Sequence, residues 1–191
     1  MKRLISAGIF LIFCLSIGFA AENPVDKGSL MVDGVVFFAM GTGDLYENNA
    51  SETPILFMAT PEFGYFVAPG FMIGGMVQFA TLSWGNEGVT VFGVGPMLGY
   101  FTDKTKDKVR GSVYPYIKGG LLYLNASMEN EVEDYGITNL VAIMGLDYML
   151  SDEVALDARI MFVNSSLEVG NNDAESGISI WFGAGFSFFL Y

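Results

Sequence analysis

The stretch that decides the fold lies at residues 177–190, which read GISIWFGAGFSFFL. Apolar side chains occupy every second position of this stretch: Ile178, Ile180, Phe182, Ala184, Phe186, Phe188 and Leu190. The residues between them are mostly small. A period of two is the period of a β-strand, whose successive side chains point to opposite faces. The stretch therefore predicts a strand with one apolar face and one face of small residues.

The same alternation recurs along the chain. At residues 136–150 and 154–166, a continuous apolar face opposes a mixed face that carries the occasional charged residue. No helical pattern with capping residues accompanies these stretches. We expect eight strands long enough to cross a membrane, at residues 29–40, 55–68, 71–83, 89–101, 112–126, 136–150, 154–166 and 177–190. Because no linker separates them, the sequence predicts one all-β domain at residues 29–191, an eight-stranded antiparallel up-and-down transmembrane β-barrel.

The composition excludes several classes of protein. With 52% apolar and only 16% charged residues, the chain is not disordered, because disorder requires low hydrophobicity and a high density of charge. Nine Lys and Arg against 21 Asp and Glu are too few to neutralise the phosphates of a nucleic acid. The chain has no histidine, so no mechanism can use an imidazole. Since phosphate-binding loops and nucleophile motifs are also absent, we expect neither an enzyme nor a cofactor.

The first twenty residues predict an export signal. Lys2 and Arg3 precede a short apolar run, and Gly18 and Ala20 supply small residues before a cleavage site. This is the pattern of a Sec signal peptide at residues 1–20, with a transmembrane anchor as the alternative. The polar residues 21–28 that follow predict a flexible N-terminal tail.

Two kinds of eight-stranded barrel would place the apolar face differently. A soluble lipocalin-like barrel, which would bind a ligand in the periplasm, turns the apolar face inward, whereas a membrane barrel turns it outward against lipid. In the soluble arrangement, the face of small residues would meet water, although it carries few charges. Such a surface would be poorly soluble. The sequence therefore favours the membrane barrel.

Several short motifs follow the predicted strands in order. They read PEFGYFV at residues 61–67, GVGP at 93–96, LGY at 98–100, YPYIKGGL at 114–121 and GLDY at 145–148. In these motifs the chain resembles the small outer-membrane protein β-barrel domain family, of the OmpA and OmpX type. The resemblance implies a place in the bacterial outer membrane, contact with lipid and lipopolysaccharide, and insertion by the barrel-assembly machinery. It implies no catalytic residues.

Charge is distributed unevenly between the predicted connections. If the chain starts in the periplasm, the segments 41–54, 84–88, 127–135 and 167–176 face outward, and they contain acidic residues but no Lys or Arg. The most acidic of them could offer oxygen ligands to a divalent cation through Glu129, Glu131, Glu133 and Asp134. The alternative interpretation is a solvated acidic rim, because the spacing matches no defined calcium-binding loop.

A few polar and charged residues point into the barrel if the apolar face meets lipid. They are Glu62, Gln78, Lys118, Asp147, Asp157 and Arg159. A three-residue turn at 69–71 would place Glu62 opposite Gln78, and one at 151–153 would place Asp147 opposite Asp157.

Facing carboxylates repel each other unless a cation lies between them. We therefore expect Arg159 and Lys118 to complete an ionic cluster that plugs the barrel, because eight strands leave an interior that side chains can fill. Paired carboxylates could instead serve acid/base chemistry or a proton path. The sequence as a whole predicts a non-enzymatic outer-membrane barrel with a structural or surface-interaction role. A narrow channel or carrier for a small solute is the first alternative.

Overall fold

The structure is a computed structural model that describes residues 21–40, 55–84, 87–102, 109–128, 135–168 and 175–191. These residues form eight strands: β1 (Leu30–Met40), β2 (Ile55–Ala68), β3 (Phe71–Trp84), β4 (Glu87–Phe101), β5 (Val113–Met128), β6 (Tyr135–Met149), β7 (Val154–Glu168) and β8 (Glu175–Leu190). No predicted boundary differs from the observed one by more than two residues. The predicted all-β fold is therefore confirmed.

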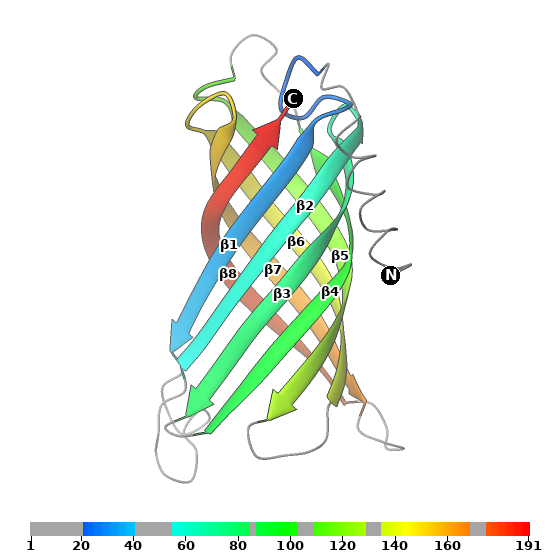
Figure 1. Ribbon diagram of the computed structural model, residues 1–191, viewed down its shortest axis with the longest axis vertical. Helices are drawn as coiled ribbons and strands as arrows, with labels where there is room; N and C mark the ends of the chain where they lie inside the picture. The colour runs from blue at the N-terminus through cyan, green and yellow to red at the C-terminus, as the bar shows by residue number, and fades with distance from the viewer. Residues whose placement is uncertain (1–20, 41–54, 85–86, 103–108, 129–134, 169–174) are drawn as a thin grey trace, which may run out of the picture.

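The strands close into a single barrel in which each strand is antiparallel to its neighbours (Figure 1). Consecutive strands pair in chain order, and β8 returns to pair with β1. The closing ladder runs from Leu30 opposite Leu190 to Val36 opposite Ala184. This is the up-and-down topology that the sequence predicts. No helix in the described residues is long and apolar enough to cross a membrane.

The two faces of each strand differ as the alternation predicts. Large apolar side chains cover the outside of the barrel on every strand; examples with half or more of their surface exposed are Val36, Phe63, Leu98, Leu121, Leu140 and Phe182. The charged side chains of the strand interiors are buried inside the barrel. This is the arrangement of a membrane barrel and the reverse of a soluble ligand-binding barrel.

The two ends of the barrel are named here by their connections. At the turn end, Pro69–Gly70 joins β2 to β3 and residues 150–153 join β6 to β7. Residues 21–29 and the C-terminus also lie at this end, at the top of Figure 1. At the opposite end, called the loop end, the connections fall at residues 41–54, 85–86, 129–134 and 169–174, outside the described part of the chain.

The turn between β2 and β3 corrects one predicted register. Gly70 adopts a positive φ of 74°, and the ladder shifts between Phe66 and Ala68. The turn thus has two residues and a bulge, not the three residues that the sequence predicted. As a result Glu62 lies opposite Met76, so the predicted pairing of Glu62 with Gln78 is wrong. The pattern of faces could not reveal this, because a bulge adds one residue without changing the alternation elsewhere.

The segment at residues 21–29 also differs from the expected flexible tail. It forms a compact turn, here called the terminal cap, in which Val25 is only 1% exposed and Ser29 is fully buried. The backbone N–H of Gly28 donates to the carbonyl of Phe66, and that of Phe66 donates to the carbonyl of Ser29. These bonds extend the β1–β2 ladder into the cap. The polar composition of the segment concealed this, because its polar groups bond to one another.

The C-terminus is held against the turn that joins β6 to β7. The backbone N–H of Phe189 donates to the carbonyl of Glu153, and the hydroxyl of Tyr191 donates to that of Asp152. Partial burial, followed by the nearby carboxylates of Asp152 and Glu153, raises the pKa of the Tyr191 phenol above its ordinary value. The hydroxyl therefore remains a donor at neutral pH.

Candidate functional site: an ionic cluster in the lumen

Six charged side chains from five strands gather inside the barrel. They form the ionic cluster: Asp33 on β1, Glu62 on β2, Lys118 on β5, Asp147 on β6, and Asp157 and Arg159 on β7. None of the six residues is more than 4% exposed. Each occupies an inward position of its strand, between neighbours that point out of the barrel. The alternation of the strands therefore brings all six toward the barrel axis.

Arg159 connects three of the four carboxylates. Its guanidinium pairs with Glu62 and Asp33, which lie on strands far away in the sequence, and with Asp157 on its own strand. The Nε–H of Arg159 donates to Asp157 Oδ2 at 2.7 Å. A planar guanidinium has five N–H donors in a fixed arrangement, which suits it to several carboxylates at once. Arg159 thus ties β7 to β1 and β2 across the lumen.

Lys118 makes a second connection between opposite walls. Its Nζ lies 2.8 Å from Asp33 Oδ2 and 2.8 Å from Glu62 Oε2. The same ammonium lies 4.4 Å from the ring centroid of Tyr116 and 5.5 Å from that of Phe101. Aromatic faces attract a cation, most strongly where water is excluded. Asp33 and Glu62, which are cross-strand partners, therefore share two cations.

Tyr116 completes the coordination of Asp157. Its hydroxyl donates to Asp157 Oδ1 at 2.6 Å, while Arg159 binds the other oxygen. The ring reaches this position because Gly145 lies opposite Tyr116 on β6 and has no side chain. A Cβ at Gly145 would overlap the hydroxyl of Tyr116. Gly145 therefore provides the space that the bond between Tyr116 and Asp157 requires.

Asp147 is the carboxylate without an ion pair. It lies directly opposite Asp157, as the length of the turn between β6 and β7 predicted. Its Oδ1 accepts a bond of 2.8 Å from the hydroxyl of Ser187, whereas its Oδ2 has no hydrogen-bond partner among the described residues. The cluster thus contains four carboxylates and two cations, and the cations serve the other three acids.

Gln78 does not join the ionic cluster. It is 8% exposed and lies on β3 opposite Gly93, nearer to the loop end than Met76, which faces Glu62. Its Oε1 has no hydrogen-bond partner in the described part of the chain. The two-residue turn with its bulge accounts for this position.

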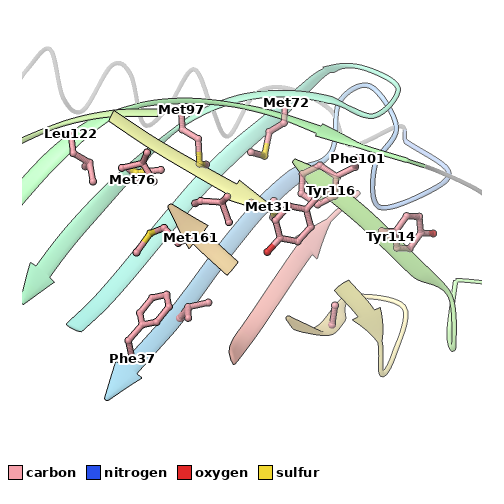
Figure 2. Packing of buried hydrophobic residues seen from close by; sticks show 14 of the residues in the cluster. Met31, Phe37, Met72, Met76, Met97, Phe101, Tyr114, Tyr116, Leu122 and Met161 are labelled. Carbon is pink, nitrogen blue, oxygen red and sulfur yellow. The ribbon is translucent and has the colours of Figure 1, made fainter. Parts of the chain in front are cut away.

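Buried apolar side chains from several strands pack together inside the barrel (Figure 2). On the strands that carry the ionic cluster, the inward residues nearer the turn end include Met31, Phe66 and Met149, and those nearer the loop end include Phe37, Met58, Leu122 and Met161. The rings of Phe101 and Tyr116 lie side by side with centroids 4.9 Å apart. Methionine adapts its shape to irregular spaces, which suits it to such a lumen.

Sequence reasoning missed two members of this site, Asp33 and Tyr116. Asp33 is the only charged residue of β1, and it follows the outward Val32, so its inward direction was readable from the alternation. Tyr116 precedes Lys118 by two positions and therefore shares its face. That its hydroxyl reaches Asp157 could not be read in this way, because the two strands meet only through β6.

The cluster consists of carboxylates, one ammonium and one guanidinium, with the Tyr116 hydroxyl beside them. The chain lacks histidine, and its one cysteine, Cys14, lies in the predicted signal peptide. In the described residues, no group of three or more acidic, histidine or cysteine side chains is arranged to hold a metal ion. The predicted cation ligands Glu129, Glu131, Glu133 and Asp134 fall outside the described residues. What the arrangement can do is link opposite walls of the barrel and occupy its lumen.

Comparison with known proteins identifies the type of barrel. No family model and no curated protein matches the chain. Among solved structures, neisserial surface protein A is similar with a TM-score of 0.59 at 16% identity, over 85% of this chain and 99% of that one. The outer membrane protein OprG from Pseudomonas aeruginosa is similar with a TM-score of 0.54 at 12% identity, over 89% and 100%. The chain therefore has the fold of these small outer-membrane β-barrels.

Proposed function

We propose that this chain is a non-enzymatic integral protein of the bacterial outer membrane. The observation that carries the proposal is the direction of the side chains, because apolar residues cover the outside of the barrel and ionic residues lie in its lumen. Hydrocarbon accepts such an exterior, whereas water does not. The fold shared with two outer-membrane proteins supports the same location. Residues 1–20 would serve as the Sec signal peptide.

The proposed role is structural or surface-interacting, with the lumen plugged. Lys118 and Arg159 link opposite walls through Asp33 and Glu62, and apolar layers lie above and below. An eight-stranded barrel has an interior that side chains can fill, so these groups would leave no continuous water path. Lipid and lipopolysaccharide would surround the barrel, and the barrel-assembly machinery would insert it. The acidic segments, with Glu129 and Glu131 among their residues, would face outward.

Fractionation of cells tests the location. The protein should stay with the membrane pellet after washes with high salt and with carbonate, because the apolar exterior holds it in the bilayer. Release would require detergent. Recovery of the processed chain as a freely dissolved monomer without detergent would overturn the proposal and would favour the soluble lipocalin-like alternative.

Planar-bilayer recording of the purified protein tests the plug. We expect the native protein to show no large, stable conductance. With the terminal cap opened by Val25→Asp, Arg159→Ala should introduce conductance. It empties part of the lumen, deprives Asp157 of its cation and leaves Asp33 and Glu62 with Lys118 alone. The control is Leu140→Ala, which removes a side chain from the outer face of β6 and should introduce no conductance.

Two results would contradict the plug. Steady conductance of the native protein would make the chain a narrow channel, the first alternative from the sequence. If Arg159→Ala folds and, with Val25→Asp, conducts no more than Leu140→Ala with Val25→Asp, the ionic cluster is not what closes the lumen.

A further inference from the structure

The terminal cap is built as a folded unit. The backbone N–H groups of Asp26 and Ser29 donate to the carbonyls of Asn23 and Asp26, both at 3.1 Å. The Asn23 side-chain amide donates to Asp26 Oδ2, and the Ser29 hydroxyl donates to the carbonyl of Asn23, both at 2.9 Å. Gly28 permits the chain to reverse, with a φ of 103°. The cap thereby satisfies much of its own polar backbone.

The cap is also attached to the barrel at two points. Its bonds to Phe66 continue the β1–β2 ladder, and the N–H of Gly70 donates to the carbonyl of Val25 at 2.8 Å. The carbonyl of Gly70 in turn accepts from Phe101 at 2.7 Å. A segment anchored to β2 and to the turn that follows it is held over the turn end of the barrel, as the dark-blue trace shows (Figure 1).

Val25 is the apolar contact between the cap and the lumen. It is 1% exposed and belongs to the buried cluster that includes Phe66, Met72 and Phe101. Phe66 and Phe101 meet edge to face with centroids 5.3 Å apart, and Phe101 also packs on Tyr116 beside Lys118. By contrast, Lys27 of the same cap is exposed to solvent. The cap thus presents Val25 to the lumen and Lys27 to the solvent.

We propose that the terminal cap is a stopper that closes the turn end of the lumen against water and small polar solutes. The closure lies on the turn-end side of the ionic cluster and uses none of its residues. It therefore stands apart from the proposed plug, and the lumen has two closures in series.

A single cysteine can report on this closure. Ala155 is fully buried on β7, two positions from Asp157 on its turn-end side, so Ala155→Cys places a thiol in the lumen between the ionic cluster and the turn end. With Cys14→Ser the chain contains no other thiol. In the full-length protein in detergent or vesicles, a small water-soluble methanethiosulfonate should label this cysteine slowly.

Opening the cap should expose the reporter. We expect Val25→Asp to raise the labelling rate at least about tenfold, because an unpaired carboxylate in an apolar site costs more than the ~1.4 kcal/mol that corresponds to this factor. Val25→Ser, a milder change, should raise the rate in the same direction. Val25 lies outside the strands, so both variants leave the barrel wall intact.

Two controls separate closure from general loosening. Lys27→Asp changes the charge of an exposed cap residue and should leave the reporter slow. Ala80→Cys places a thiol at an inward position of β3 toward the loop end. The reagent should modify this thiol at the same rate with and without Val25→Asp.

Three results would overturn the stopper. They are rapid labelling of Ala155→Cys under the native cap, no acceleration by either Val25 variant, and equal acceleration at the Ala80 position. The stopper and the plug fail in different ways, because loss of the stopper changes the labelling of a residue on the turn-end side of the ionic cluster, whereas loss of the plug changes conductance with the cap already opened.

Discussion

Arg159 shows how much a single residue does in this lumen. Its guanidinium pairs with carboxylates from β1, β2 and β7, all of them buried. Taking charges out of water is costly, and the cost is recovered only where each charge has partners of good geometry. In a barrel wall that meets lipid, the lumen is the only place in which such partners can meet. The residue thus serves to connect distant strands.

Tyr116 allows a sharp prediction at this scale. Tyr116→Phe removes the hydroxyl that donates to Asp157 Oδ1 and leaves a buried oxygen without that partner. We expect the free energy of unfolding to fall by about 1–3 kcal/mol. Tyr123→Phe is the matched control, because its ring is outward and 60% exposed, and it should change little. Urea unfolding in lipid vesicles measures both; equal effects would contradict the role of the bond.

Two turn glycines, Gly70 and Gly111, differ in how closely other atoms surround them. Gly70 and Gly111 both have a positive φ, of 74° and 82°. A Cβ at Gly70 would overlap the carbonyl oxygen of Phe101, whereas a Cβ at Gly111 would meet nothing within 4 Å. The sequence shows two glycines in turns, and only the fold distinguishes them.

Substitution by alanine separates strain from crowding. Gly111→Ala should cost about 1–2 kcal/mol of stability, the usual cost of a left-handed backbone for an L-residue. Gly70→Ala should cost about 1–3 kcal/mol more, because the strand or the cap must also shift. Thermal unfolding of the two variants in the same detergent gives the comparison. A Gly70 variant as stable as the Gly111 variant would show that the turn has room.

The closing seam is the least paired junction of the barrel. β1 pairs with β8 over residues Leu30 to Val36, whereas its residues Phe37 to Met40 pair only with β2. In the described residues, β8 therefore lacks a β1 partner from Glu175 to Gly183. The rings of Phe37 and Trp181 meet there edge to face, with centroids 6.4 Å apart.

Hydrogen exchange should reveal this seam. We expect the backbone amides of residues 177–183 to exchange faster, on average, than those of residues 184–190 on the same strand, because fewer of them lie in a two-sided ladder. Mass spectrometry of the protein in lipid bilayers can resolve the two halves of β8. Equal protection would mean that the seam is closed in the membrane.

At the scale of the whole molecule, orientation determines where the protein can reside. Leu121 lies near the middle of β5 and is 50% exposed on the outer face. Leu121→Arg should destabilise the inserted barrel by about 2–4 kcal/mol, the cost of an arginine facing the centre of a bilayer. Ser151→Arg, at an exposed turn, should insert normally. Folding yield into vesicles, followed by the gel mobility of the folded form, measures both; equal yields would place the outer face in water.

Much of the architecture could be predicted because a strand is a local structure. The period of two placed each strand within two residues of its observed bounds and assigned its faces. Even the position of Asp147 opposite Asp157 followed from the length of a short turn. The candidate site was predicted less completely. The inward residues were readable one strand at a time, yet Asp33 was overlooked and Gln78 was placed in the wrong register.

The amino-acid sequence by itself determined that this chain forms eight strands with an apolar outer face, because the alternation of side chains along a strand depends only on neighbouring residues. Only the tertiary structure decided which inward groups meet. Closing the sheet brings Arg159 to Glu62, 97 positions away, and Lys118 to Asp33, 85 positions away. Closing the sheet also forms the lumen against which Val25 of the terminal cap packs. The physical reason is that contacts across a barrel depend on closure and stagger, which no local pattern records.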